Sequence, residues 1–121
     1  MNIEGDDRAV DRPAPSKLAA GAVVCRLEGD LDLDTAGTAR VLLDEGLASA
    51  ARVLVVDLAA VAFCDSSGLN LLLRTRLTAE GAGKVVRLAA PPDQLMRLLD
   101  LTGASGVFPL YATVADALHN P

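Results

Sequence analysis

The sequence is poor in aromatic, histidine and cysteine side chains, and these shortages limit its chemistry. Aromatic residues make up 2% of the 121 positions, although 51% of the residues are hydrophobic. A core must therefore be built from Leu, Val and Ala. With one histidine, His119, and two cysteines, the chain offers no ligand set for a structural zinc site. Cys25 and Cys64 lie within apolar segments, which indicates buried free thiols in a reducing compartment.

Basic charge is also scarce. The chain has 11 Lys and Arg residues against 16 Asp and Glu residues, for a net charge of −5. Because nucleic-acid binders carry a basic patch, we expect no direct binding to DNA or RNA. The first residues lack a basic segment followed by an apolar one, and no apolar run reaches the roughly 20 residues of a membrane span. We therefore expect a cytoplasmic protein that does not bind membranes.

Motifs of several enzyme classes are missing. No Gly-x-Ser-x-Gly elbow surrounds Ser66 or Ser67, and no phosphate-binding or dinucleotide-binding glycine loop is present. A nucleophilic serine needs a nearby base, and His119 lies close to the C-terminus. A small hydrolase that pairs Ser66 with a lysine stays open, although no other feature supports it. We expect no enzymatic activity and no cofactor.

Alternating apolar segments predict one α/β domain. Strands are predicted before Gly21 and at 22–27, 53–58, 84–88 and 107–110, with helices at 36–47, 66–79, 93–102 and 114–119. Strands separated by helices imply crossover connections and a largely parallel sheet, and an opening hairpin makes the sheet mixed. The polar segment Met1–Ser16 shows no periodicity and is predicted to be a mobile tail, with the domain spanning residues 17–121.

Two helix starts carry the polar residues of interest. Asp65, Ser66, Ser67 and Gly68 separate a buried strand from a helix, and Asp and Ser are typical N-cap residues. Capping alone would account for them, but a helix N-terminus also accommodates a phosphate, so both interpretations stay open. The inner face of this helix is predicted at Leu69, Leu72, Leu73 and Leu77, and that of the helix over 93–102 at Leu95, Leu98, Leu99 and Thr102.

The other polar stretch, residues 28–35, is predicted to be an acidic loop in which Asp34 or Thr35 caps the following helix. Its carboxylates Asp30, Asp32 and Asp34 could surround a divalent ion with Asp65, but their spacing matches no known metal loop, and we expect a solvated surface without metal. Loops that follow parallel strands share one edge of the sheet. We therefore expect Asp32 to lie near Ser66 if the two strands are adjacent.

These two stretches resemble a known family. The segment 27–32, Leu-Glu-Gly-Asp-Leu-Asp, is similar to the Gly-Glu-Leu-Asp motif of anti-sigma factor antagonists, with Asp30 where the family commonly has glutamate. The segment 65–69, Asp-Ser-Ser-Gly-Leu, resembles their phosphorylation motif. The resemblance covers about residues 17–118. It implies the STAS fold, a mixed, mostly parallel sheet of four to five strands with helices mainly on one face.

The resemblance also implies a function. Proteins of this kind bind an anti-sigma factor that carries a serine kinase ATPase domain, and so release a sigma factor for transcription. Phosphorylation of the first serine, here Ser66, ends the binding, and a serine phosphatase reverses it; Ser67 is the less favoured acceptor. Asp32 is implied to aid kinase contact or phosphotransfer, in a site environment that includes Asp30, Asp65, Ser67 and Gly68. We expect a monomer. The alternative is a STAS adaptor subunit of a membrane transport or stress-sensing complex without phospho-switching.

Overall fold

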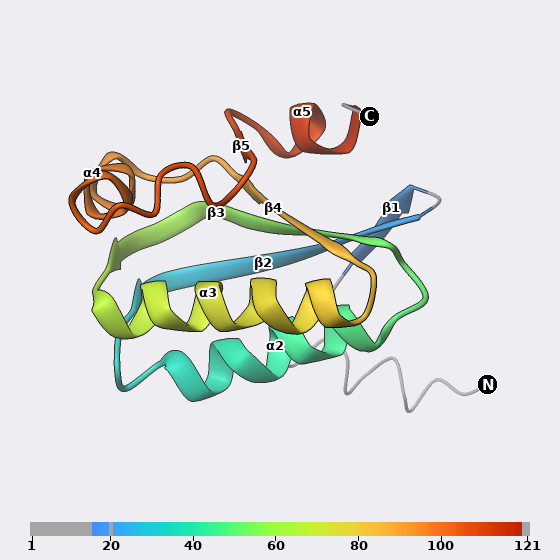
Figure 1. Cartoon of the computed structure of the whole chain (residues 1–121), viewed down its shortest axis with the longest axis horizontal. Helices are drawn as coiled ribbons and strands as arrows, with labels where there is room; N and C mark the ends of the chain where they lie inside the picture. Colours follow the sequence, from blue (N-terminus) through green and yellow to red (C-terminus); the bar gives the residue numbers. More distant parts are fainter. Residues whose placement is uncertain (1–15, 20, 120–121) are drawn as a thin grey trace.

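The computed structural model describes residues 16–19 and 21–119, which form a five-stranded sheet and four helices (Figure 1). The strands are β1 (Ser16–Ala19), β2 (Ala22–Leu31), β3 (Val53–Cys64), β4 (Val85–Ala89) and β5 (Leu110–Tyr111). The helices are α2 (Ala36–Ala48), α3 (Ser66–Gly81), α4 (Asp93–Leu101) and α5 (Val114–His119). Of the predicted tail, residues 1–15 lie outside the described residues, and Ser16 is the first residue of β1.

The strands follow one another across the sheet in chain order, β1-β2-β3-β4-β5. β1 pairs antiparallel with β2, and every later pair is parallel. The mixed, mostly parallel sheet expected from the alternating segments is therefore confirmed. β2 and β3 form the longest pairing, from Ala22 beside Val53 to Leu31 beside Cys64, with two register irregularities on the way. These two strands carry the connections to α2 and α3.

The helices cover the two faces of the sheet unequally. Figure 1 shows α2 and α3 side by side beneath the sheet and α5 on the opposite side. Leu54, Val56 and Leu58 of β3 point into the main core, whereas Val55 packs in a smaller cluster that includes Ala117 of α5. This alternation follows from the two-residue period of a strand. The expectation of helices mainly on one face is confirmed.

Two strands are longer than predicted, and one is displaced. β2 continues from Leu27 to Leu31 and β3 from Leu58 to Cys64, so residues 28–31 are strand and not part of an acidic loop. The prediction failed because exposed side chains such as Glu28 and Asp30 interrupt the apolar pattern while backbone pairing with β3 continues. The last strand lies at Leu110–Tyr111 instead of 107–110.

The predicted inner face of α3 is partly wrong. Leu69 and Leu72 are buried as expected, but Leu77 is 62% exposed. Leu71 and Thr75 are buried in its place. The reason is that α3 packs against α2 as well as against the sheet, which turns its buried face toward the neighbouring helix.

Thr102, predicted on the inner face of α4, is also exposed, and its hydroxyl donates to the carbonyl oxygen of Leu98 at 2.8 Å. Within residues 16–19 and 21–119, no helix has the length and apolar character needed to cross a membrane.

Candidate functional site

Asp65 begins α3 at the corner that the sequence singled out. Its backbone is extended, and its Oδ1 atom accepts hydrogen bonds from the amide nitrogens of Ser67 at 2.8 Å and Gly68 at 3.1 Å. These amides belong to the first turn, where no helix carbonyl is available to them. The capping predicted for this corner is therefore confirmed. Ser66, the first residue of the helix, is exposed, and Ser67 is half-buried.

Gly68 brings this corner against the end of β2. A Cβ atom at Gly68 would lie 2.6 Å from the carbonyl oxygen of Leu31 and 2.8 Å from Sγ of Cys64, both closer than real Cβ contacts. The amide of Asp65 also donates to the carbonyl oxygen of Leu31 at 3.0 Å. Absence of a side chain at Gly68 thus permits the first turn of α3 to pack directly on β2.

The loops after β2 and β3 are consequently neighbours. Asp32 follows Leu31, and Asp65 follows Cys64, which is the partner of Leu31 in the sheet. This confirms that the two motifs meet at one edge of the sheet, although they lie more than 30 residues apart in the chain. Asp32 is half-buried and Asp30 is exposed.

Asp32 organises the turn into α2. Its Oδ1 atom accepts from the amides of Asp34 at 3.0 Å and Thr35 at 3.1 Å. The Thr35 hydroxyl donates to the carbonyl oxygen of Asp30 at 2.7 Å and accepts from the amide of Asp32 at 3.0 Å. Thr35, one of the two predicted candidates, is the N-cap residue of α2, but its side chain makes no capping hydrogen bond. The backbone carbonyl oxygen of Asp32 instead accepts from the amide of Ala36, the first residue of the helix, at 2.9 Å.

Gln94, in the first turn of α4, fixes the end of β3 and was not predicted. Its Oε1 accepts from the amide of Cys64 at 2.8 Å, and its Nε2 donates to the carbonyl oxygen of Cys64 at 2.7 Å. β4 pairs with β3 only as far as Asp57 beside Ala89, so no strand among the described residues reaches Cys64 on that side. The Gln94 amide takes the place of that missing strand immediately before the Asp65 corner. No local pattern connects Gln94 with a residue 30 positions away.

Both cysteines are buried free thiols, as predicted. Burial, and to a smaller extent the neighbouring Asp65 carboxylate, raises the pKa of Cys64 to about 11. Burial and then Glu45 raise the pKa of Cys25 to about 12. Since the thiolate is the reactive form, Cys64 lies beneath the corner as a neutral packing group.

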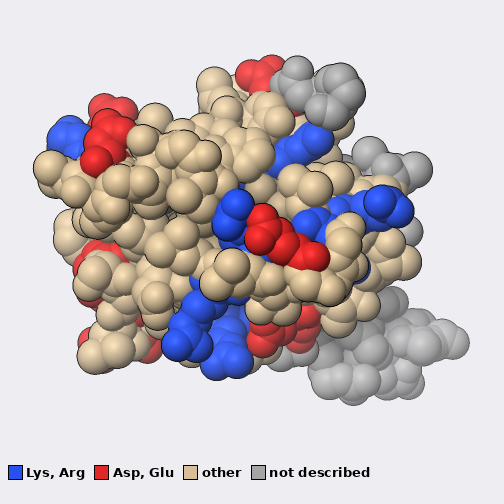
Figure 2. All heavy atoms as spheres, viewed as in Figure 1, with Lys and Arg blue, Asp and Glu red and all other residues tan. Residues whose placement is uncertain are grey.

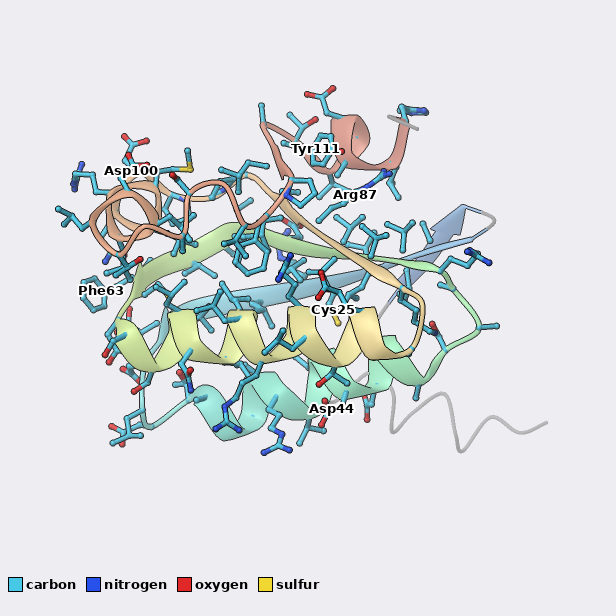
Figure 3. The ribbon with its side chains drawn as sticks, in the orientation of Figure 1. Cys25, Asp44, Phe63, Arg87, Asp100 and Tyr111 are labelled. Carbon is cyan, nitrogen blue, oxygen red and sulfur yellow. The ribbon has the colours of Figure 1, made fainter. Side chains whose placement is uncertain are left out.

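The surface around Ser66 combines acidic and apolar side chains. Phe63 is 46% exposed, and Figure 3 shows its ring directed away from the end of β3. Leu33, in the loop after β2, is 77% exposed. Figure 2 shows acidic residues at the left end of the molecule, where Figure 1 places the end of β3 and the start of α3. Exposed apolar side chains rimmed by polar ones are typical of a protein-binding surface. Among the described residues, no group of three His, Cys, Asp or Glu side chains is arranged to hold a metal ion.

Comparisons with known proteins agree with this geometry. The STAS domain family model matches residues 15–117. The anti-sigma F factor antagonist of Paenibacillus polymyxa is 32% identical over 100 residues, covering 81% of this chain and 85% of the relative. The anti-sigma-F factor antagonist RsfB of Mycobacterium tuberculosis is 34% identical over 100 residues, covering 81% of this chain and 80% of the relative.

Solved structures extend the comparison. An anti-sigma factor antagonist from Mycobacterium paratuberculosis has a TM-score of 0.75 at 30% identity, covering 89% of this chain and 92% of the other. A sulfate transporter family protein from Wolinella succinogenes has a TM-score of 0.73 at 18% identity, covering 85% and 86%. The second likeness concerns the fold alone. The same fold therefore occurs in different functional settings.

Proposed function

This chain belongs to the STAS domain family, and we propose that it is an anti-sigma factor antagonist whose binding is switched off by phosphorylation of Ser66. The unphosphorylated protein would bind an anti-sigma factor with a serine kinase ATPase domain and so free a sigma factor. A serine phosphatase would restore the binding form. The names of relatives at 32% and 34% identity support the first part of this proposal.

The observation that carries the switch is the placement of Ser66. This serine is exposed at the first position of α3, while its neighbours Asp65 and Gly68 are fixed by the cap and by close packing on β2. A partner can therefore reach the hydroxyl on a rigid corner. The kinase supplies the ATP and the phosphoryl chemistry, so the chain acts as a substrate and not as an enzyme.

A phosphate on Ser66 would change the surface more than the fold. It adds about −1.5 to −2 charges at neutral pH, and the positive end of the helix dipole tolerates them. Asp65 already accepts from the amides of Ser67 and Gly68. The phosphate would therefore face solvent or the partner, beside the carboxylates of Asp30 and Asp32.

The required effect is small in energy. A 1,000-fold loss of affinity corresponds to about 4 kcal/mol. A dianion that is desolvated in an interface without a cationic partner can supply this amount. We propose that the negative charges of Asp30 and Asp32 recruit a basic group of the kinase and so orient it at Ser66.

The proposal is tested by affinity capture from a native lysate with three full-length baits: wild type, Ser66→Asp and Ala112→Asp, which adds the same charge at an exposed position between β5 and α5. We expect a serine-kinase-type ATPase on the wild-type and Ala112→Asp baits and its loss from the Ser66→Asp bait. Capture of membrane-transport subunits by all three baits would instead support the adaptor alternative. Thermal unfolding of each bait checks that it is folded.

A further inference from the structure

A groove runs between α2 and α3, starting at the corner that carries the serines. It consists of two connected hollows of about 290 Å³ and 510 Å³ that share Arg40, Asn70, Leu71 and Arg74. The first hollow reaches Leu33 and Ser67, and the second reaches Leu77 and Thr78. The groove therefore begins beside the proposed phosphorylation site and continues along α3.

The groove offers apolar surface that the fold itself does not use. Leu71 is buried at its floor, whereas Leu77 at one end and Leu33 at the other are 62% and 77% exposed. A large apolar side chain gains about 1.5–3 kcal/mol when it is fully buried. A partner that covers Leu33 and Leu77 would gain part of this energy at each end.

The charge at the groove is opposite to that of the whole chain. Arg40 and Arg74 line both hollows, against one carboxylate, Asp44. Nε of Arg40 lies 3.6 Å from Oδ2 of Asp44, which makes an ion pair within α2. No ion pair within the described residues involves Arg74. Figure 2 shows a basic patch at the bottom of the molecule, where Figure 1 places α2 and α3. In a chain of net charge −5, this patch selects for an acidic partner surface.

We propose that the groove between α2 and α3 binds an acidic amphipathic helix of the anti-sigma factor. This inference rests on the proposed function and names the chemistry by which its partner is recognised. Apolar side chains of the helix contact Leu33, Leu71 and Leu77, and its carboxylates face Arg40 and Arg74. This is the helix-in-groove mode of recognition.

The length of the groove fits such a helix. The α3 residues from Ser67 to Thr78 span about 16 Å at 1.5 Å per residue, which matches three turns of a bound helix. Because Ser67 lines the same groove, a helix seated there also lies beside Ser66. A phosphate on Ser66 would then place its negative charge near the acidic helix, which gives the switch a direct electrostatic cause.

A photo-crosslinker at the groove tests this proposal. The full-length chain carries Leu77→p-benzoylphenylalanine and is irradiated in native lysate; a chain with the crosslinker at Val85, which is exposed outside the groove, is the control. The crosslinked peptide is identified by mass spectrometry. From the Leu77 position we expect a crosslink to an acidic, helix-forming segment of the ATPase that the wild-type bait retains. From the Val85 position we expect no such crosslink.

Charge reversal then tests the role of the arginines. In the Leu77 crosslinking chain, Arg40→Glu with Arg74→Glu should lower the crosslink yield about tenfold or more. Arg52→Glu with Arg97→Glu makes the same change in net charge at exposed positions outside the groove and should leave the yield unchanged. Urea unfolding checks both variants, and Arg40→Gln with Arg74→Gln replaces the reversal if that variant is unfolded.

Several results would overturn the proposal. One is a crosslink from Leu77 to a basic segment, to residues 1–15 of this chain or to a second copy of the chain. Another is a crosslink yield that stays the same when the charges of the groove arginines are reversed. A third is the absence of any crosslink from Leu77 while the wild-type bait retains the ATPase.

The phospho-switch is judged separately from the groove. If Ser66→Asp still retains the ATPase while the acidic segment crosslinks through the arginines, the groove stands and the phospho-switch fails. If the crosslinked acidic segment, whose yield depends on the groove arginines, comes from a protein that is not a serine-kinase-type ATPase, the groove proposal fails together with the proposed function.

Discussion

Gly68 and Leu31 lie so close together that a Cβ atom on the glycine would be 2.6 Å from the carbonyl oxygen of the leucine. This contact joins the first turn of α3 to the last residue of β2. It holds the serine corner beside the acidic turn, so the two sequence motifs form one surface. The stability of that surface can be tested residue by residue.

Gly68→Ala should destabilise the protein by about 1–3 kcal/mol, because the new methyl group meets backbone atoms that cannot move away. Gly37→Ala is the matched control in α2, where a Cβ would meet nothing within 4 Å. Alanine is the better helix former, so the control should be neutral or more stable by up to about 1 kcal/mol. Urea unfolding measures both, and equal stability of the two variants would contradict the packing described here.

Gln94→Ala should free the end of β3, because the amide and the carbonyl group of Cys64 each lose a partner. An unsatisfied buried backbone group costs about 1–3 kcal/mol. Amide hydrogen exchange should accelerate at Cys64 more than at Val55 in the middle of the strand. Arg97→Ala, on an exposed part of the same helix, should change neither rate. Unchanged protection of Cys64 in Gln94→Ala would show that α4 does not support this corner.

Substitutions of Asp32 separate its structural role from its charge. Asp32→Ala removes the acceptor of two turn amides and should cost about 1 kcal/mol in unfolding free energy. Asp32→Asn keeps an acceptor oxygen and should retain most of the stability. If Asp32 orients the kinase by its charge, Asp32→Asn should still slow phosphorylation of Ser66, as followed by intact-mass spectrometry. Phosphorylation at the wild-type rate would restrict Asp32 to holding the turn.

The buried thiols should make the protein less stable in alkali. Their folded-state pKa values, about 11 for Cys64 and about 12 for Cys25, lie above the ordinary value of 9.0. Above pH 9 the unfolded chain releases protons that the folded chain keeps, so the unfolding free energy falls by up to about 1.4 kcal/mol per pH unit for each thiol. Below pH 9 the folded and the unfolded chain both keep the thiol protons, so the full unfolding free energy is present. Urea midpoints between about pH 8 and about pH 10.5 should fall less steeply in Cys64→Ala than in wild type. Equal slopes would contradict the raised pKa.

The sequence could predict the corner because its information is local. Asp65 and Ser66 are N-cap residue types between an apolar strand and an apolar helix, and a parallel sheet brings consecutive strand ends together. The apolar pattern could not predict the full length of β2 and β3. Glu28 and Asp30 are exposed, so they interrupt the pattern while the backbone pairing continues.

The remaining differences arise from contacts between distant segments. Leu77 fits a helical stripe in sequence, yet the position of α2 decides which side of α3 is buried, and Leu77 is left exposed. Gln94 contacts a residue 30 positions earlier, and no periodicity records this. The groove between α2 and α3 likewise depends on how two helices lie side by side, and so it follows from the structure alone.

The most direct test of the phospho-switch is the affinity of the ATPase retained by the wild-type bait for two forms of this protein. One form is unmodified, and the other carries phosphoserine at position 66, introduced during translation. Isothermal titration should show a loss of at least about 1,000-fold, or about 4 kcal/mol, for the phosphorylated form. Thermal unfolding of the two forms should be nearly the same. Equal affinity for both forms, with both folded, would contradict the switch at Ser66.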